Sequence, residues 1–199
     1  SMDSGRSWSR RVQVCSNSYE TTLAVSSDFN TIYALCPVSD QLNNPQQWSI
    51  DLVSSQDSGL TWSNVGNLPF TSSSRLEVTP GEAILLESKG RLFVVLTEKK
   101  SGENPTWKIF TSSSSDSGKT WTQFREESQG RFSLLSGATS TSPNGELQLG
   151  WWELDGYFVW SKSIDFGKTW EEQTKVGQGE IRYPSLVVAS NNDQPFLIY

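Results

Sequence analysis

Short apolar segments separated by turn residues recur along the whole chain. Each contains about four to six residues and is bounded by Gly, Pro, Asn, Asp or Ser, which is typical of β-strands joined by hairpin turns. No segment has the 3.6-residue period of an amphipathic helix. The predicted strands span residues 22–25, 32–35, 48–53, 83–86, 92–96, 107–110, 137–140, 147–152, 157–160, 186–189 and 196–199. The pattern therefore predicts an all-β protein.

An eight-residue pattern occurs four times, with the order Ser, any, Asp, any, Gly, any, Ser or Thr, Trp. The copies, which we call octapeptides 1 to 4, span residues 1–8, 55–62, 114–121 and 163–170. Their aspartates are 54, 59 and 49 residues apart, so the chain consists of repeated units large enough for one small sheet each. The defining residues are Asp3, Gly5, Trp8, Asp57, Gly59, Trp62, Asp116, Gly118, Trp121, Asp165, Gly167 and Trp170.

Each octapeptide has the composition of a hairpin turn. The Asp accepts hydrogen bonds from the backbone N–H groups that follow it, the Gly adopts a positive φ, and the Ser or Thr hydroxyl closes the loop. The Trp is expected to begin the next strand and to bury its ring against a neighbouring sheet. We therefore predict a structural role for the four aspartates, in preference to a calcium site or an acid–base pair.

The octapeptide resembles the Asp-box, or BNR repeat, of sialidase-like β-propellers. Asp-boxes also occur in other glycosidases, in sortilin-type receptors and in non-catalytic propellers, so the resemblance implies a fold more strongly than an activity. In that family the boxes lie between the third and fourth strands of each four-stranded antiparallel blade, away from the active site. The resemblance implies a β-propeller of about four blades, or a fragment of a larger propeller.

The repeat predicts a single domain over residues 1–199. Three blades are expected at about 19–70, 75–128 and 132–176, and a split blade at 181–199 plus 1–14. Two arrangements follow from the split. Either the termini meet to complete a four-bladed ring, or the chain is part of a longer propeller that exposes blade faces and forms homo-oligomers. We favour the second arrangement, because Asp-box proteins resemble rings of six or more blades.

Composition narrows the chemistry. The 199 residues include no histidine, which excludes a His base, Ser-His-Asp and Cys-His nucleophiles and His-ligated zinc. Two cysteines, Cys15 and Cys36, are too few for a Cys-rich metal site. They leave open one disulfide, which would suit an oxidising compartment. We therefore predict no metal and no cofactor.

The charge balance and the apolar pattern limit the partners. Sixteen Lys and Arg against 22 Asp and Glu give a formal charge of −6, whereas nucleic-acid binding depends on an excess of Lys and Arg. No apolar run approaches the roughly 20 residues that a membrane helix needs. We expect a secreted or extracytoplasmic protein that binds a glycan or a protein, and neither nucleic acid nor a membrane interior.

Ligand-binding residues are expected where the innermost strands of a propeller begin and the second strands end, because these points converge around the central channel. The candidates before inner strands are Glu20, Glu82, Arg131, Arg182 and Tyr183, and those at second-strand exits are Glu98, Trp151, Trp152 and Glu153. Carboxylates, guanidinium groups and aromatic faces suit a polar, sugar-like ligand. Adjacent strand residues point to opposite faces, so we expect one of the two indoles to be buried and the other to face the channel or solvent.

The segment Ile181-Arg182-Tyr183-Pro184 resembles the Arg-x-Pro core of a motif that opens the first blade of sialidases. The resemblance implies that Arg182 grips a substrate carboxylate bidentately. Two of the four motif positions differ, and the segment lies in the last unit. Pro184 also has a plain structural use at the start of an inner strand.

Sialidases use three arginines, a Tyr nucleophile activated by a Glu, and an Asp acid/base. Besides Arg182, only Arg131 or Arg75 could reach the channel, so the catalytic residues stay unknown, with Tyr183 and Glu153 as candidates. We predict a sialidase-like module for glycan recognition, which as part of a glycoside hydrolase would be of the exo-sialidase type. The alternative is a non-catalytic, protein-binding receptor propeller. A third hypothesis is a small intact enzyme that uses Tyr183 or Tyr199 with Glu153.

Overall fold

The structure is a computed structural model. It describes residues 4–16, 18, 21–39, 48–70, 83–100, 106–130, 132–134, 139–141, 146–153, 156–178, 185–188 and 195–198. Every helix or strand element within these ranges is a β-strand. None of these residues belongs to a helix with the length and apolar character needed to cross a membrane. The predicted all-β class is confirmed.

Successive antiparallel strands form four sheets, which we call blades 1 to 4. Blade 1 contains β1 (Thr22–Val25), β2 (Ile32–Ser39), β3 (Trp48–Ser55) and β4 (Ser63–Asn67), and blade 2 contains β5 (Ile84–Ser88), β6 (Arg91–Lys100), β7 (Thr106–Ser114) and β8 (Arg125–Gly130). Blade 3 contains β10 (Thr139–Thr141), β11 (Leu147–Glu153), β12 (Tyr157–Ser163) and β13 (Thr174–Gln178). The short β9 (Phe132–Leu134) pairs with β11, and blade 4 contains β14 (Ser185–Val188) and β15 (Pro195–Ile198).

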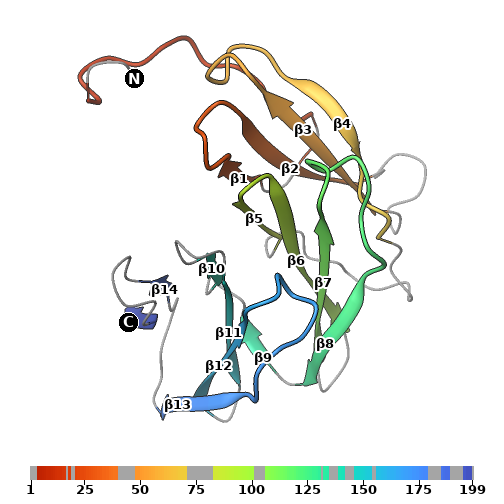
Figure 1. The fold of residues 1–199 in the computed structure, drawn as a ribbon, viewed down its shortest axis with the longest axis vertical. Helices are drawn as coiled ribbons and strands as arrows, with labels where there is room; N and C mark the ends of the chain where they lie inside the picture. The colour runs from red at the N-terminus through yellow and green to blue at the C-terminus, as the bar shows by residue number, and fades with distance from the viewer. Residues whose placement is uncertain are drawn as a thin grey trace.

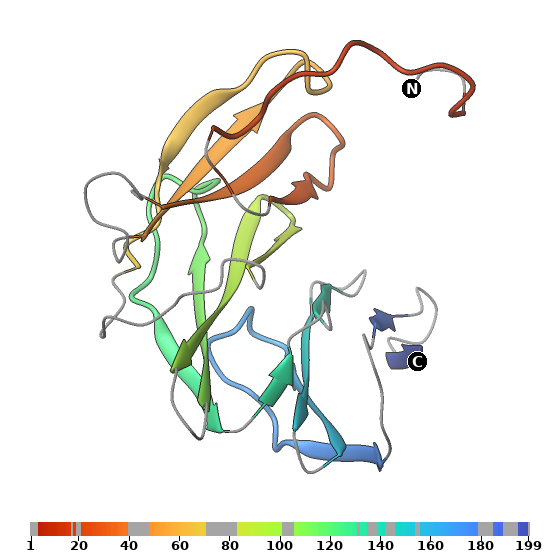
Figure 2. The ribbon, with the colours of Figure 1, turned by 180° about the vertical axis from the view of Figure 1, so that it is seen from behind.

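The four blades follow one another along an open arc (Figure 1). Their innermost strands β1, β5, β10 and β14 contact one another in succession. Figure 2 shows from behind that the N-terminal segment lies beside blade 1, apart from the C-terminal hairpin. The predicted four-stranded antiparallel blades are observed for blades 1 and 2, whereas the described part of the chain forms no closed ring. The proposed blade boundaries, including the split blade, stay predictions.

The blades pack through two apolar clusters, and β6 contributes to both. Leu92, Val94 and Leu96 face blade 1, whereas Phe93 and Val95 face blade 3. All five side chains are buried. Alternate residues of a strand point to opposite faces, so a strand between two blades reads as a continuous apolar run. This explains the unbroken segment at 92–96.

Residues 4–16 are attached to blade 1 by a disulfide between Cys15 and Cys36 of β2. The sequence alone left this bond open. Residues 4–8 of octapeptide 1 lie in this segment, and Trp8 is 79% exposed. The expectation that each octapeptide Trp begins a strand and buries its ring is therefore wrong for Trp8, because residues 9–15 are not in a strand and no sheet covers the indole. Trp121 and Trp170 do not begin a strand either, since β8 and β13 start four residues after them.

Candidate functional site

Octapeptides 2, 3 and 4 form the same hydrogen-bonded turn between the third and fourth strands of their blades. In octapeptide 3, Ser114 Oγ donates to Asp116 Oδ1 (2.8 Å) and accepts from Gly118 N–H (2.8 Å). Thr120 donates its N–H to Asp116 Oδ1 (2.9 Å) and its hydroxyl to Asp116 Oδ2 (2.6 Å). The corresponding bonds are present in octapeptides 2 and 4. The aspartates thus hold the turn, as their spacing predicts.

These bonds lower the pKa of each aspartate to about 2, from an ordinary 3.8. For Asp57 and Asp116 the Thr hydroxyl four residues later has the largest effect, followed by the N–H of the same Thr. Burial raises the pKa of Asp165, but the bonds from Thr169 and Ser163 outweigh it. A carboxylate whose oxygens already accept several donors is held in its ionised form. The lowered pKa values therefore agree with a structural role for the three aspartates.

The glycine of an octapeptide packs against the preceding blade. Gly118 has a φ of +90°, and a Cβ built there would overlap with Leu52 of blade 1. A Cβ on Gly167, with a φ of +81°, would overlap with Phe93 of blade 2. Around Gly59 the nearest atoms belong to its own blade, at 3.8 Å or more. The glycines at 118 and 167 are therefore required by packing as well as by backbone conformation.

Octapeptide 4 differs from octapeptides 2 and 3 in the donor that satisfies its glycine carbonyl. Trp62 and Trp121 donate their indole N–H to Gly59 O (3.1 Å) and Gly118 O (3.0 Å). In octapeptide 4 the donor to Gly167 O is Arg125 of blade 2, at 2.7 Å. The buried indole N–H of Trp170 has no hydrogen-bond partner among the residues that the structure describes.

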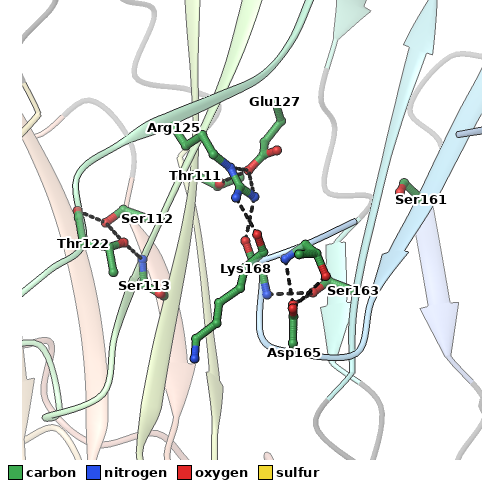
Figure 3. Close-up of polar contacts among 12 residues, drawn as sticks. Thr111, Ser112, Ser113, Thr122, Arg125, Glu127, Ser161, Ser163, Asp165 and Lys168 are labelled. Atoms are coloured by element: carbon green, nitrogen blue, oxygen red, sulfur yellow. Dashed lines mark hydrogen bonds and ion pairs between the residues drawn. The ribbon is translucent and has the colours of Figure 1, made fainter. Parts of the chain in front are cut away.

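Arg125 is held between two blades (Figure 3). Besides Gly167 O, it donates through Nη1 to Lys168 O (2.5 Å) and through Nε and Nη2 to Glu127 Oε1 (2.9 and 2.7 Å). Glu127 Oε1 also accepts the hydroxyl of Thr111 at 2.5 Å. The guanidinium thus uses its fork of donors to join the outer strand of blade 2 to the turn of blade 3.

The predicted ligand residues at the second-strand exits lie at the opposite end of the blades. Leu92 and Leu147 pair with the first residues of octapeptides 3 and 4, so they occupy equivalent positions in their blades. Glu98 and Glu153 follow them by six residues and therefore also occupy the same position of the repeat. Glu98 is only 1% exposed. Glu153 is 25% exposed and forms an ion pair with Lys175 (2.7 Å). Of these two carboxylates, Glu153 is the one that a ligand could reach.

Two of the predicted ligand contacts do not agree with this structure. Trp151 is 2% exposed and packs in the cluster between blades 2 and 3, so it offers no open face to a sugar. Glu98 is excluded from solvent by the packing of β6 between two blades. The side chain of Trp152 lies outside the described residues, as do Arg182, Tyr183, Arg131, Glu20, Glu82, Arg75, Tyr199 and Asp3.

Sequence reasoning missed Arg125, Thr111 and Lys175. The sequence does contain a signal for Arg125, which lies four residues after Trp121. The corresponding residues after Trp62 and Trp170 are uncharged, Gly66 and Thr174. A departure from the repeat at an equivalent position is the mark that could have identified it. Lys175 carries no comparable mark. Within the described residues, no three Cys, His, Asp or Glu side chains gather in a way that could hold a metal ion.

Solved structures with a similar fold include glycoside hydrolases. No family model matches the chain, and no curated protein sequence does. A family 93 α-L-arabinofuranosidase of Fusarium graminearum, in complex with arabinobiose, is similar with a TM-score of 0.57 and 19% identity, over 83% of this chain and 50% of that one. A family 117 glycoside hydrolase of Zobellia galactanivorans gives a TM-score of 0.53 and 10% identity, over 84% and 48%.

A Trypanosoma rangeli sialidase, in complex with 2,3-difluorosialic acid, is similar with a TM-score of 0.50 and 14% identity, over 94% of this chain and 34% of the sialidase. The chain thus spans about half the length of the first two enzymes and a third of the sialidase. At these identities the likeness concerns the fold alone. The blades of this chain therefore have the fold of propeller-type glycosidases.

Proposed function

We propose that this chain is a module of a sialidase-like Asp-box propeller and that it recognises a glycan. The recognition surface is the end of the blades that carries Glu153, opposite the octapeptides. Three similar structures of this fold are glycosidases, and two of them contain a sugar ligand. Their greater length supports the further proposal that this chain supplies part of a larger ring.

Glu153 and its ion pair with Lys175 carry this proposal. Glu153 is the last residue of the second strand of blade 3, at the repeat position that Val38 occupies in blade 1 and the buried Glu98 occupies in blade 2. A carboxylate accepts hydrogen bonds from two adjacent sugar hydroxyls, and an ammonium group donates to others. Glu153 and Lys175 offer both functions within 2.7 Å of each other. From its sequence context, we propose that Arg182 also contributes to this site by binding the carboxylate group of the glycan.

The proposed role is binding, without turnover by this chain alone. A sialidase mechanism needs several arginines and a Tyr–Glu pair, and the sequence offers no complete set. The disulfide between Cys15 and Cys36 supports an extracytoplasmic location, because such bonds persist in oxidising compartments.

Titration calorimetry of the full chain against sialic acid and arabino-oligosaccharides tests this function. We expect binding by at least one of them, weakened about tenfold by Glu153→Gln, which corresponds to losing one charge-assisted hydrogen bond. Glu171→Gln is the matched control, because Glu171 also pairs with a lysine (Lys162, 3.6 Å) but directly follows octapeptide 4, at the opposite end of the blade. A fluorogenic sialoside should not be hydrolysed. Absence of binding to every glycan would overturn the proposal.

A protein ligand is the second candidate, and the exposed apolar residues of blade 1 favour it. Leu23 and Val25 of β1 are 58% and 48% exposed, and Phe29 in the following turn is 84% exposed. Apolar side chains gathered on a surface are typical of protein contacts. A Leu23→Ser/Val25→Ser variant would lose a protein partner and keep glycan binding, which separates the two functions.

A further inference from the structure

A pocket lies between blades 2 and 3, on the octapeptide side of the molecule. Its volume is about 220 Å³. The walls come from the end of β7, from the segment between octapeptide 3 and β8, and from the turn of octapeptide 4. The lining residues are Phe93, Thr111, Ser112, Ser113, Thr122, Gln123, Arg125, Gly167 and Lys168. No carboxylate is among them.

The pocket forms where blade 2 departs from the repeat. In blade 1, Leu52 lies three residues before the octapeptide and pairs with Gly66 of the neighbouring strand. Its side chain fills the space beside Gly118 of blade 2. The corresponding pair in blade 2 is Thr111 and Arg125. A smaller polar residue replaces the leucine that fills the contact, and a guanidinium replaces a glycine. The hollow and its cation thus arise from the same two positions.

Several polar groups in the lining of the pocket are held in place before any ligand binds. Ser112 Oγ donates to Thr122 O at 2.7 Å, and Thr122 Oγ1 accepts from Ser113 N–H at 3.0 Å. Four bonds fix the guanidinium of Arg125 and leave one of its five N–H donors, on Nη1, for another acceptor. Preorganised donors lose little freedom on binding, which favours affinity.

Lys168 gives the pocket a second positive charge. Its side chain extends from the turn of octapeptide 4 toward the strands of blade 2 (Figure 3). It forms no ion pair within the part of the chain that the structure describes. The charge of Arg125 is balanced by Glu127, whereas the charge of Lys168, which also lines the pocket, has no such counter-ion among the described residues.

We propose that this pocket binds one sugar unit that carries a carboxylate or a sulfate group. Ligand pockets commonly measure roughly 300–1,000 Å³, so 220 Å³ suits a single ring rather than an oligosaccharide. Hydroxyls of Ser113 and Thr122 and the amide of Gln123 match sugar hydroxyls, and either of the two cations that line the pocket, Lys168 or Arg125, matches the anionic group. This site is separate from the proposed glycan surface, since it lies at the other end of the strands.

The test is titration of the full chain with glucuronate, glucose and inorganic sulfate, followed by calorimetry and by amide NMR shifts. We expect glucuronate to bind at least tenfold more tightly than either glucose or sulfate, with shifts at Thr122, Gln123 and Lys168. Equal affinity for glucuronate and sulfate would overturn the sugar site in favour of a simple anion site. Equal affinity for glucuronate and glucose, or no binding, would also overturn it.

Four variants localise the binding. Lys168→Gln should weaken glucuronate binding about tenfold, whereas Lys119→Gln, at the same position of octapeptide 3, should not change it. Thr111→Leu gives blade 2 the leucine that blade 1 has at the equivalent position, and it should abolish glucuronate binding by filling the pocket. Circular dichroism should show that this variant retains the fold. Glu153→Gln should leave glucuronate binding at this pocket unchanged, so failure of the proposed glycan function does not affect this test. Unchanged binding by Lys168→Gln and Thr111→Leu would contradict the proposal.

Discussion

Blade 2 contacts blade 1 on one side and blade 3 on the other, and both contacts are built from the same repeat. They differ in the residue that fills the contact and in the donor that bonds the glycine carbonyl of the octapeptide. In the first, Leu52 fills the space beside Gly118, and octapeptide 3 satisfies its own carbonyl through Trp121. In the second, Thr111 leaves a pocket, and Arg125 satisfies the carbonyl of Gly167 from the neighbouring blade. The repeat thus preserves its turn, while the contact between blades is free to change from apolar to polar.

The largest effect that tests this comparison is expected from alanine at Gly118. A positive φ costs an alanine about 1–2 kcal/mol, and overlap of the new Cβ with Leu52 adds about 1–3 kcal/mol. Gly59→Ala is the control, because its φ is also positive (+86°) but its nearest neighbours lie at 3.8 Å or more. Urea denaturation should show the larger loss for Gly118→Ala. Equal losses would mean that packing against blade 1 contributes nothing.

An intermediate effect is expected from Arg125→Lys. The lysine keeps the positive charge but has no planar fork, so it cannot bond Gly167 O, Lys168 O and Glu127 together. We expect a loss of roughly 1.5–3 kcal/mol in the free energy of unfolding, the range for hydrogen bonds to charged groups. Arg91→Lys, whose guanidinium lies over the ring of Phe166 in the same contact, is the matched control and should cost less. A stability like that of the parent chain would show that charge alone holds the contact.

The smallest effect concerns pH and is shared by both contacts. The pKa values of Asp57, Asp116 and Asp165 in the folded chain are about 2, below the ordinary 3.8. Groups with a lowered folded pKa stabilise the fold above the unfolded pKa and lose that contribution as the pH falls. Stability should therefore decrease between about pH 4 and pH 2, and Asp116→Asn should flatten this decrease in thermal unfolding. A slope that the substitution does not change would contradict the role of these bonds.

The sequence was sufficient to predict features that depend on neighbours in the chain. The strands, the hairpin turns and the structural role of Asp57, Asp116 and Asp165 follow from short apolar segments bounded by turn residues and from a local hydrogen-bond pattern. The burial of Trp151 did not follow, because both indoles of the pair 151–152 suit either a core or a ligand platform. Which of them faces the neighbouring blade is decided by the pairing register.

Contacts between distant residues were also beyond the sequence pattern. Arg125 contacts carbonyls 42 and 43 residues later, and no local signal states which carbonyl an arginine will reach. The exposure of Trp8 was missed for a related reason. Octapeptide 1 has the positive φ values of the other copies at Ser4 and Gly5, but the strands that would cover its indole are not beside it.

The most direct test of the difference between the two contacts is the NMR signal of the Trp170 indole N–H. The double variant Thr111→Leu/Arg125→Gly gives blade 2 the residues of blade 1 at the two equivalent positions. We expect the Trp170 indole N–H to form a hydrogen bond with Gly167 O, as Trp121 does with Gly118 O, and its exchange with solvent deuterium to slow relative to the parent chain. Unchanged exchange in a folded double variant would contradict the claim that residues 111 and 125 determine which donor forms the hydrogen bond with Gly167 O.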